Sequence, residues 1–416
     1  MKVERWTIAL ATAGVINLAS VVQAEEQASS VMTALSSTTL SGYVDTSAQW
    51  NFGTGNANMP PYKFGGPSKA DGFNLDVVQL RIEKPLDESE WAAGYRVDLW
   101  AGPDANVLGT QSTLPTGASD FAIRQAYVAL RVPVYNGLDF KVGVFDSIIG
   151  YESVESPNNP NYTRSYGHSI EPQTHTGILA AYRFSDLVSA SFGVANTVNS
   201  SINSRAQSGS SGVSSGVFGS LFGASPFPAG SNPYAESYKA YMGSLALTAP
   251  DSLGFLSGST LYGGVVNGFN NSVLGSGGGI PTLNAYVGAT IATPVTGLRL
   301  GAAWDLLSAN TQVAGTKVEA DVWSLAGYAS FQATEKLSLH GRFEYASGDV
   351  DQPISTGNGI YAFTATAQYD LWQNVLSRIE FRWDHVEHGL AFGGTVPGEP
   401  TRENAYMLAA NVIYKF

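Results

Sequence analysis

The alternating pattern of the last stretch, residues 402–416, restricts the fold more than any other feature of the sequence. Every second position is apolar or aromatic, namely Tyr406, Leu408, Ala410, Val412, Tyr414 and Phe416. The positions between them are smaller or more polar. Because successive side chains of a β-strand face opposite sides, this stretch predicts a strand with one apolar face and one mixed face. An apolar outer band flanked by aromatic residues is typical of a strand in a transmembrane β-barrel.

The same period of two recurs along the chain and predicts an all-β fold. The candidate strands lie near 40–50, 78–83, 91–100, 121–132, 138–146, 174–184, 188–197, 235–248, 255–267, 282–293, 297–308, 319–331, 335–346, 358–370, 375–386 and 402–416. This pattern indicates about 16 strands, and boundary errors of about two to four residues leave 14 to 18 open. An open sheet edge cannot exist in lipid, so the prediction is a closed antiparallel transmembrane barrel.

The connections between these strands alternate between short and long. The long ones are predicted at 101–120, 147–173, 198–234, 268–281 and 387–401. Short periplasmic turns and long extracellular loops are the usual asymmetry of outer-membrane barrels. A soluble β-sandwich remains the alternative, because alternation alone does not say which face meets water. The number of strands, the aromatic ends and the loop alternation together favour the barrel.

Composition excludes several function classes. The 416 residues include no cysteine, which excludes thiol nucleophiles and cysteine-based zinc sites. The formal net charge of −12 shows no basic excess, so nucleic acid is not an expected partner. Charged residues make up only 13% of the chain, against about a quarter in soluble domains. Low charge with neutral mean hydropathy suits alternating strands better than long apolar helices.

The first residues predict export. Lys2 and Arg5 precede a mostly apolar stretch, and Val22-Gln23-Ala24 forms a small-x-small cleavage site. This pattern predicts a cleaved signal peptide over 1–24, with a helical membrane anchor as the alternative. We expect a short periplasmic lead over 25–38 and the barrel over 39–416.

One predicted loop differs from the others in composition. Residues 146–173 are rich in tyrosine and charge, and the residues that we expect to act there are Asp146, Tyr151, Glu152, Glu155, Tyr162, Arg164, Tyr166 and Glu171. A long loop with a defined composition is more often functional than disordered. Oxygen donors in the same stretch leave a calcium site as an alternative, although their spacing lacks the EF-hand order.

Several short motifs carry a family resemblance. They are Tyr43-Val44-Asp45-Thr46, Gly143-Val144-Phe145-Asp146, Gly150-Tyr151-Glu152, Asn158-Asn159-Pro160-Asn161-Tyr162, Arg164-Ser165-Tyr166-Gly167, Glu171-Pro172 and His175-Thr176-Gly177. With these motifs the chain resembles the OmpL-like family, the second family of putative β-barrel porins, over most of its length after residue 38. The resemblance implies an outer-membrane channel without naming a solute. General porins fold their third outer loop into the lumen, so it also implies that loop 146–173 forms a constriction. The terminal Phe416 resembles the signal by which the barrel assembly machinery recognises outer-membrane barrels.

A basic wall is expected opposite this loop. In a ring of about 16 strands, the wall facing the fifth strand is near the thirteenth. The basic residues predicted to line the lumen there are Arg299, Lys336, Arg342, Arg378 and Arg382. Such a wall facing an acidic loop would set ion selectivity. Alternatively, Arg342 pairs with Glu344, and Arg378 and Arg382 pair with Glu380 and Asp384, along their own strands.

The sequence therefore predicts an outer-membrane porin through which ions and small hydrophilic solutes diffuse passively. We expect no catalytic residue, metal or other cofactor, and a homotrimer by analogy. The rival hypotheses are a sugar- or anion-specific channel, a structural barrel with a plugged lumen, and a lipid hydrolase. The sugar channel would use ring stacking on the tyrosines Tyr43, Tyr151, Tyr162 and Tyr166. The hydrolase would need His340 and Ser338 as a catalytic pair.

Overall fold

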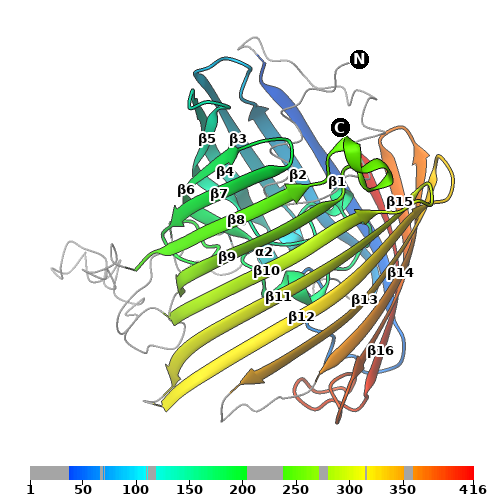
Figure 1. The fold of residues 1–416 in the computed structure, drawn as a ribbon. Helices are drawn as coiled ribbons and strands as arrows, with labels where there is room; N and C mark the ends of the chain where they lie inside the picture. Colours follow the sequence, from blue (N-terminus) through cyan, green and yellow to red (C-terminus); the bar gives the residue numbers. More distant parts are fainter. Residues whose placement is uncertain are drawn as a thin grey trace.

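The chain closes into a barrel of sixteen antiparallel strands, in which each strand pairs with its neighbours in the sequence (Figure 1). The computed structural model describes residues 37–65, 69, 71–108, 110, 119–203, 238–270, 280–313, 316–350 and 359–416. The predicted closed antiparallel barrel, with its central estimate of the strand number, is therefore confirmed. The signal peptide and most of the predicted loop 198–234 lie outside the described residues.

The strands lie in chain order around the barrel. Their bounds are β1 Thr39–Asn51, β2 Gly72–Lys84, β3 Ala92–Ala101, β4 Phe121–Val132, β5 Leu138–Asp146, β6 Thr174–Arg183, β7 Val188–Ala195, β8 Ala240–Thr248, β9 Thr260–Asn270, β10 Ile280–Ala292, β11 Leu298–Val313, β12 Thr316–Gln332, β13 Leu337–Val350, β14 Ile360–Trp372, β15 Val375–Val386 and β16 Asn404–Lys415. The short helices are α2 Pro103–Leu108, η3 Ser156–Asn158, α3 Tyr166–Ile170 and η4 Asp251–Leu256. None of the helices in the described part of the chain is long and apolar enough to cross a membrane.

The first and last strands close the ring. β1 pairs with β16 in a continuous antiparallel register that runs from Tyr43 opposite Lys415 to Asn51 opposite Met407. At the end of this seam, Gly42 and Phe416 exchange two backbone hydrogen bonds of 2.9 and 3.0 Å. The alternating terminal stretch is thus the closing strand, and it leaves neither β1 nor β16 with an unpaired edge along this register.

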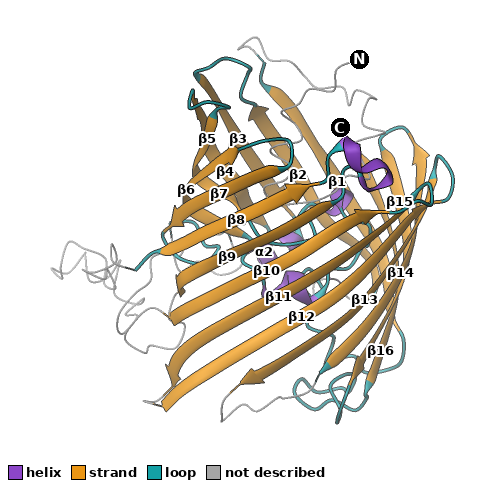
Figure 2. Cartoon of the chain, viewed as in Figure 1, coloured by secondary structure: helices purple, strands orange, loops and turns teal. Residues whose placement is uncertain are grey.

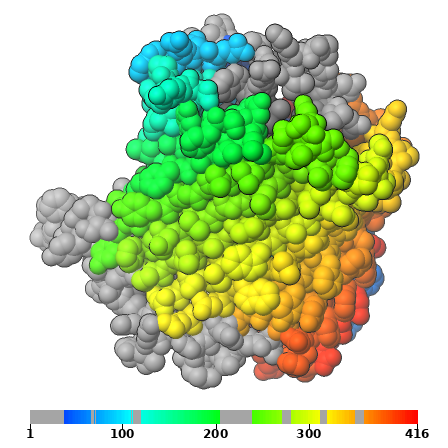
Figure 3. Space-filling model, viewed as in Figure 1, coloured from blue at the N-terminus to red at the C-terminus, as the bar shows by residue number. Residues whose placement is uncertain are grey.

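Alternation places apolar side chains outside and polar ones inside. In β15, Ile379 and Phe381 are 62% and 38% exposed, whereas Arg378 and Arg382 are 1% and 0% exposed. Exposed aromatic side chains lie near both ends of β16, at Tyr406 and Tyr414. The outer face of the green to orange strands forms a continuous surface (Figure 3). An apolar exterior over a polar interior is the arrangement expected of a barrel in lipid.

Some strands begin or end at other residues than the sequence predicted. β11 and β12 continue past the predicted ends at 308 and 319, and pair from Leu298 opposite Phe331 to Val313 opposite Thr316. β9 starts at Thr260 rather than near 255, because η4 occupies the first part of that stretch. The predicted loop 101–120 begins with helix α2. The short helices α2 and α3 lie inside the ring of strands (Figure 2).

Candidate functional site

The loop between β5 and β6, residues 147–173 (called L3 below), lies inside the barrel (Figure 1). Most of its side chains are buried, including Glu152, Glu155 and Arg164 at 3–6% exposure. Its first turn uses Gly150, whose φ of 125° lies in the region that favours glycine. The helix α3 follows Ser165, whose side chain accepts a hydrogen bond from the backbone N–H of His168 at 3.1 Å. L3 is therefore an ordered part of the interior and not a surface loop.

On one side, L3 binds a cluster of three arginines that we call the arginine hub: Arg81 on β2, Arg96 on β3 and Arg124 on β4. Glu155 of L3 pairs with Arg81, with Arg96 at 3.1 Å and with Arg124 at 2.8 Å. The wall residue Asp98 pairs with the same three arginines at 2.7–3.0 Å. Burial raises the pKa of Glu155, but the three arginine charges outweigh burial and hold its pKa below the usual value. The hub thus fixes one side of L3 with permanent charge.

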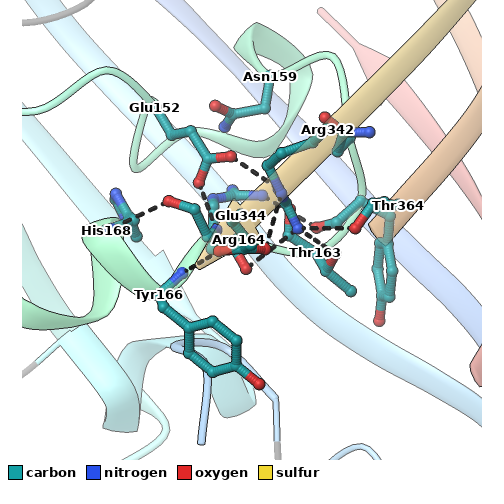
Figure 4. A network of polar contacts seen from close by, with 12 residues as sticks. Glu152, Asn159, Thr163, Arg164, Tyr166, His168, Arg342, Glu344 and Thr364 are labelled. Atoms are coloured by element: carbon teal, nitrogen blue, oxygen red, sulfur yellow. Dashed lines mark hydrogen bonds and ion pairs between the residues drawn. The ribbon is translucent and has the colours of Figure 1, made fainter. Parts of the chain in front are cut away.

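On the opposite side, L3 binds the arginine clamp, which consists of Arg342 on β13 and Arg382 on β15. The Arg342 Nη1 donates to Glu152 at 2.7 Å and to the backbone oxygen of Thr163 at 2.9 Å. Arg382 donates to the backbone oxygen of Arg164 at 2.8 Å. Figure 4 shows Glu152 and Arg342 pointing toward each other, with Thr163 and Arg164 beside them. Both guanidinium groups are fully or almost fully buried, at 1% and 0% exposure.

Three carboxylates of the same wall bind donors of L3. Glu380 accepts from the backbone N–H of Tyr162 at 2.6 Å and of Thr163 at 2.9 Å. Glu344 accepts from the backbone N–H of Tyr166 at 2.6 Å, and Asp384 accepts from its phenol at 2.6 Å. The carboxylates of this wall therefore hold the segment 162–166 in place by accepting hydrogen bonds from its backbone N–H groups and its tyrosine hydroxyl.

Arg378 of β15 also binds L3, through carbonyl groups. It donates to the backbone oxygens of Ser156 at 3.0 Å and Asn159 at 2.6 Å. The along-strand pairing considered from the sequence forms for Arg342 with Glu344 at 3.1 Å and for Arg382 with Asp384 at 2.8 Å. Arg342 and Arg382 thus bind L3 and their strand neighbours at once. The alternative pairing of Arg378 with Glu380 is not among the ion pairs of the described residues, and Arg378 donates to Gln368 of β14 at 3.2 Å instead.

The helical end of L3 lies against the wall of β10 and β11. The Glu171 side chain lies beside Asp305 of β11, and the Nδ1 of His168 is 3.5 Å from the Glu171 Oε2. Asn284 of β10 donates to the backbone oxygen of Ile170 at 3.0 Å. Among the ion pairs of the described residues, none joins Glu171 or Asp305 to an arginine, and the nearest pair is that of Glu171 with His168. This side of L3 is chemically unlike the other two.

The remaining predicted site residues have different surroundings. Asp146 lies at the end of β5 and pairs with Arg124 of the hub. Tyr151 stacks on Tyr328, with ring centroids 4.1 Å apart. Arg299 lies at the start of β11, with a buried Nη1. Lys336 is exposed in the turn before β13, so its predicted place on the wall is wrong: the strand begins one residue later.

Sequence reasoning missed the whole arginine hub. Arg81 and Arg96 share the inward parity with Asp98, and their alternation could have indicated a charged inner face on β2 and β3. It also missed the loop between β1 and β2, which enters the lumen. There the ring of Tyr62 lies 4.2 Å below the Arg382 guanidinium, and the Lys63 N–H donates to Ser169 of L3 at 2.7 Å.

The geometry bears on the sugar channel, the lipid hydrolase and the calcium site. The rings of Tyr43, Tyr162 and Tyr166 are 2–8% exposed, so their faces are not available for stacking on a sugar. His340 contacts Ser330 at 2.9 Å rather than Ser338, so the predicted hydrolase pair does not form. Within the described part of the chain, no three His, Asp or Glu residues form a group that could hold a metal ion.

A closed sixteen-stranded barrel with an apolar exterior and a polar interior is the architecture of outer-membrane porins. The model of the family described as "Putative beta-barrel porin-2, OmpL-like" matches residues 37–416, and the chain belongs to this family. No curated protein sequence matches the chain significantly. The protein is accordingly an outer-membrane porin, as the sequence predicted.

Solved structures share the fold at low sequence identity. OmpF of Salmonella typhi in complex with daunomycin has a TM-score of 0.56 at 12% identity, covering 91% of this chain and 97% of that chain. In-vitro folded OmpT of Vibrio cholerae in its trimer form has a TM-score of 0.55 at 9% identity, covering 91% and 99%. An anion-selective porin from Comamonas acidovorans has a TM-score of 0.54 at 12% identity, covering 91% and 99%. These likenesses establish the barrel architecture.

Proposed function

We propose that ions and small hydrophilic solutes diffuse through this porin past L3, which acts as the constriction of the lumen. The observation that carries the proposal is the fixation of L3 inside the barrel by ion pairs to opposite walls, through Glu155 to the hub and Glu152 to Arg342. A loop held in this way narrows the lumen, so it sets the size of the solutes that pass. A general diffusion channel fits better than a sugar channel, because the tyrosine faces are packed.

Ion preference in this proposal depends on the balance between the clamp arginines and the acids that they bind. Neutralising Arg342, Arg378 and Arg382 together by glutamine leaves Glu152, Glu344 and Asp384 without those partners. The freed carboxylates attract cations into the constriction. The triple variant should therefore shift ion selectivity toward cations.

The experiment is single-channel recording of the refolded protein in a planar bilayer, with the reversal potential measured in a salt gradient. Ohmic steps from the wild type support the porin, and a shift of the reversal potential toward the cation potential in the triple variant supports the constriction. Arg183→Gln, at the end of β6 where the guanidinium pairs with the exposed Asp186, is the matched control and should behave as the wild type. An unchanged reversal potential in a folded triple variant would reject the clamp arginines as selectivity residues.

We further infer how the chain reaches the outer membrane and assembles there. Residues 1–24 serve as a cleaved signal peptide, supported by their sequence pattern. The barrel assembly machinery recognises the closing strand through Phe416, and the mature barrel forms a homotrimer in lipid. The trimer form of the OmpT structure favours this assembly by analogy. Cross-linking of the protein in outer membranes tests the trimer, and the mass of the mature chain tests the cleavage.

A further inference from the structure

Two buried acids at the helical end of L3 contact each other directly. Glu171 and Asp305 are 6% and 4% exposed, and their carboxyl groups lie within hydrogen-bonding reach. An ionised carboxylate only accepts hydrogen bonds, so a bond between two carboxyl groups requires a proton on one of them. The contact is thus possible only in a protonated state of the pair.

The nearest basic groups do not replace that proton. His168 has its Nδ1 3.5 Å from the Glu171 Oε2, and both ring nitrogens are buried without a hydrogen-bond partner among the described residues. Lys63, from the loop between β1 and β2, donates its Nζ to the backbone oxygen of Glu171 at 3.3 Å. The lysine therefore binds the main chain of the acid.

The other titratable or charged groups near Glu171 and Asp305 either bind different partners or carry no charge. Glu152 adds negative potential to Asp305 but binds Arg342 at 2.7 Å. Arg164 donates to backbone oxygens of L3 itself. The Tyr286 hydroxyl of β10 is buried near Asp305 and is an uncharged phenol. A shared proton is the remaining way to satisfy the two acids.

Burial determines the protonation states of Glu171 and His168 at the helical end of L3. Burial, followed by the charge of Asp305, raises the pKa of Glu171 to about 8. Burial also lowers the pKa of His168 to about 4, although the neighbouring Glu171 opposes this. Near pH 7 both side chains are therefore neutral in the closed arrangement.

We propose that Glu171 and Asp305 form a proton-dependent latch that holds the α3 end of L3 against β11. Loss of the shared proton leaves two buried negative charges in contact, and L3 leaves the wall to hydrate them. The backbone at Gly167 approaches the Asp305 side chain closely, so α3 itself moves with the latch. This inference rests on the proposed role of L3 as the constriction, and release widens the passage beside α3.

The direction and range of the effect follow from proton linkage. Between about pH 4.5 and 8 the closed state binds more protons at Glu171 than the released state, so rising pH weakens the latch. Between about pH 4 and 6.5 His168 acts in the opposite sense and cancels most of this change. From about pH 6.5 to 8 Glu171 weakens the latch by roughly 15-fold, because its slope flattens as the pH approaches its own pKa. The titrations of His168 and Lys63 at the two ends of this range oppose Glu171 and reduce the net change to roughly fourfold.

Lys63 acts above this window. Burial lowers its pKa to about 8, although the charge of Glu171 opposes this. Between about pH 8 and its ordinary value near 10.5, the closed state binds fewer protons at Lys63 than the released state. Rising pH therefore strengthens the contact again, and the released state should be most populated near pH 8.

The test compares the wild type with isosteric variants at pH 6.5 and 8.0. Single-channel recordings should show the ratio of the wide to the narrow conductance state rising roughly fourfold in the wild type. Glu171→Gln should remove this response, because the amide does not titrate in the range. Asp305→Asn should move the response to lower pH, because the charge that helps to raise the pKa of Glu171 is lost. Asp186→Asn, in an exposed turn, is the control and should keep the wild-type response.

A second measurement separates the latch from conduction. The chain contains no cysteine, so a single Ile170→Cys can carry an environment-sensitive dye at the end of α3. Its emission should change between pH 6.5 and 8.0, and Glu171→Gln should suppress the change. Normal conductance with an emission and a state ratio that do not depend on pH would overturn the latch and leave the porin intact. A folded barrel that never conducts would overturn the proposed function, whereas the dye response would still support the latch.

Discussion

The two sides of L3 are held by opposite kinds of chemistry. At the clamp, Arg342 and Arg382 neutralise the buried carboxylates beside them, with contacts of 2.7–3.1 Å. At the latch, Glu171 meets Asp305 with no arginine between them. Arginine keeps its charge at every pH that a cell meets, whereas a carboxyl pair depends on a proton. The comparison indicates that the clamp defines where L3 lies and that the latch decides how firmly its helical end stays there.

The clamp should dominate the stability of the barrel. Removing one partner of a buried ion pair leaves an uncompensated charge, which costs more than the pair itself contributes. Replacing Arg342 by methionine leaves Glu152 and Glu344 facing each other in the interior. We expect a loss of about 3–5 kcal/mol in the free energy of unfolding. Urea unfolding of the refolded protein, followed by tryptophan fluorescence, measures it.

Arg342→Lys is the control for this variant. It keeps the positive charge but not the fork of donors that reaches Glu152 and the Thr163 carbonyl, so its loss should be smaller. A methionine variant as stable as the wild type would mean that L3 is held by packing alone. In that case the distinction between clamp and latch would disappear.

The hydrogen bond between Tyr166 and Asp384 tests the same wall, with a smaller expected effect on the free energy of unfolding. The Tyr166 phenol donates to Asp384 at 2.6 Å, and hydrogen bonds to charged groups contribute about 1.5–3 kcal/mol. Tyr166→Phe should cost an amount in this range, because the ring stays buried and only the hydroxyl is lost. Tyr135→Phe is the matched control, since Tyr135 is 97% exposed and should tolerate the change. Equal unfolding midpoints for the two variants would show that the Asp384 contact adds nothing.

The sequence predicted the barrel well because its signal is local. Side-chain direction along a strand depends only on parity, so the closing strand 402–416 and the inward position of Arg342 could be read residue by residue. Closure of the barrel followed from the requirement that no sheet edge meets lipid. The lengths of β11 and β12 could not be predicted, because the apolar alternation stops after Leu306, where Ser308, Asn310 and Gln312 follow at the outward positions, while the pairing continues to Val313.

The contacts of L3 could not be predicted in the same way. Tyr162 and Glu380 are 218 residues apart, and no local period encodes which wall residue a loop residue meets. The arginine hub could not be predicted for the same reason, because its three arginines come from three strands and meet only where Glu155 of L3 binds them. The close approach of two acidic side chains, Glu171 and Asp305, departs from the expectation that an acid pairs with a basic group. Such an exception is visible only in three dimensions.

Ser165 lies between the two regions and gives the finest test of the comparison. Its side chain caps α3 by accepting from the His168 N–H at 3.1 Å, while its own N–H donates to the clamp-bound Glu152 at 2.7 Å. Ser165→Ala removes the cap, which costs about 1 kcal/mol, together with the contact between its hydroxyl and Tyr328 of β12. Ser165→Asp keeps a cap acceptor and is the control, although it adds charge. If the cap only shapes α3, the alanine variant should leave the pH response of the latch in place while lowering the unfolding free energy slightly. A loss larger than that of Tyr166→Phe would mean that α3, and not the clamp, organises L3.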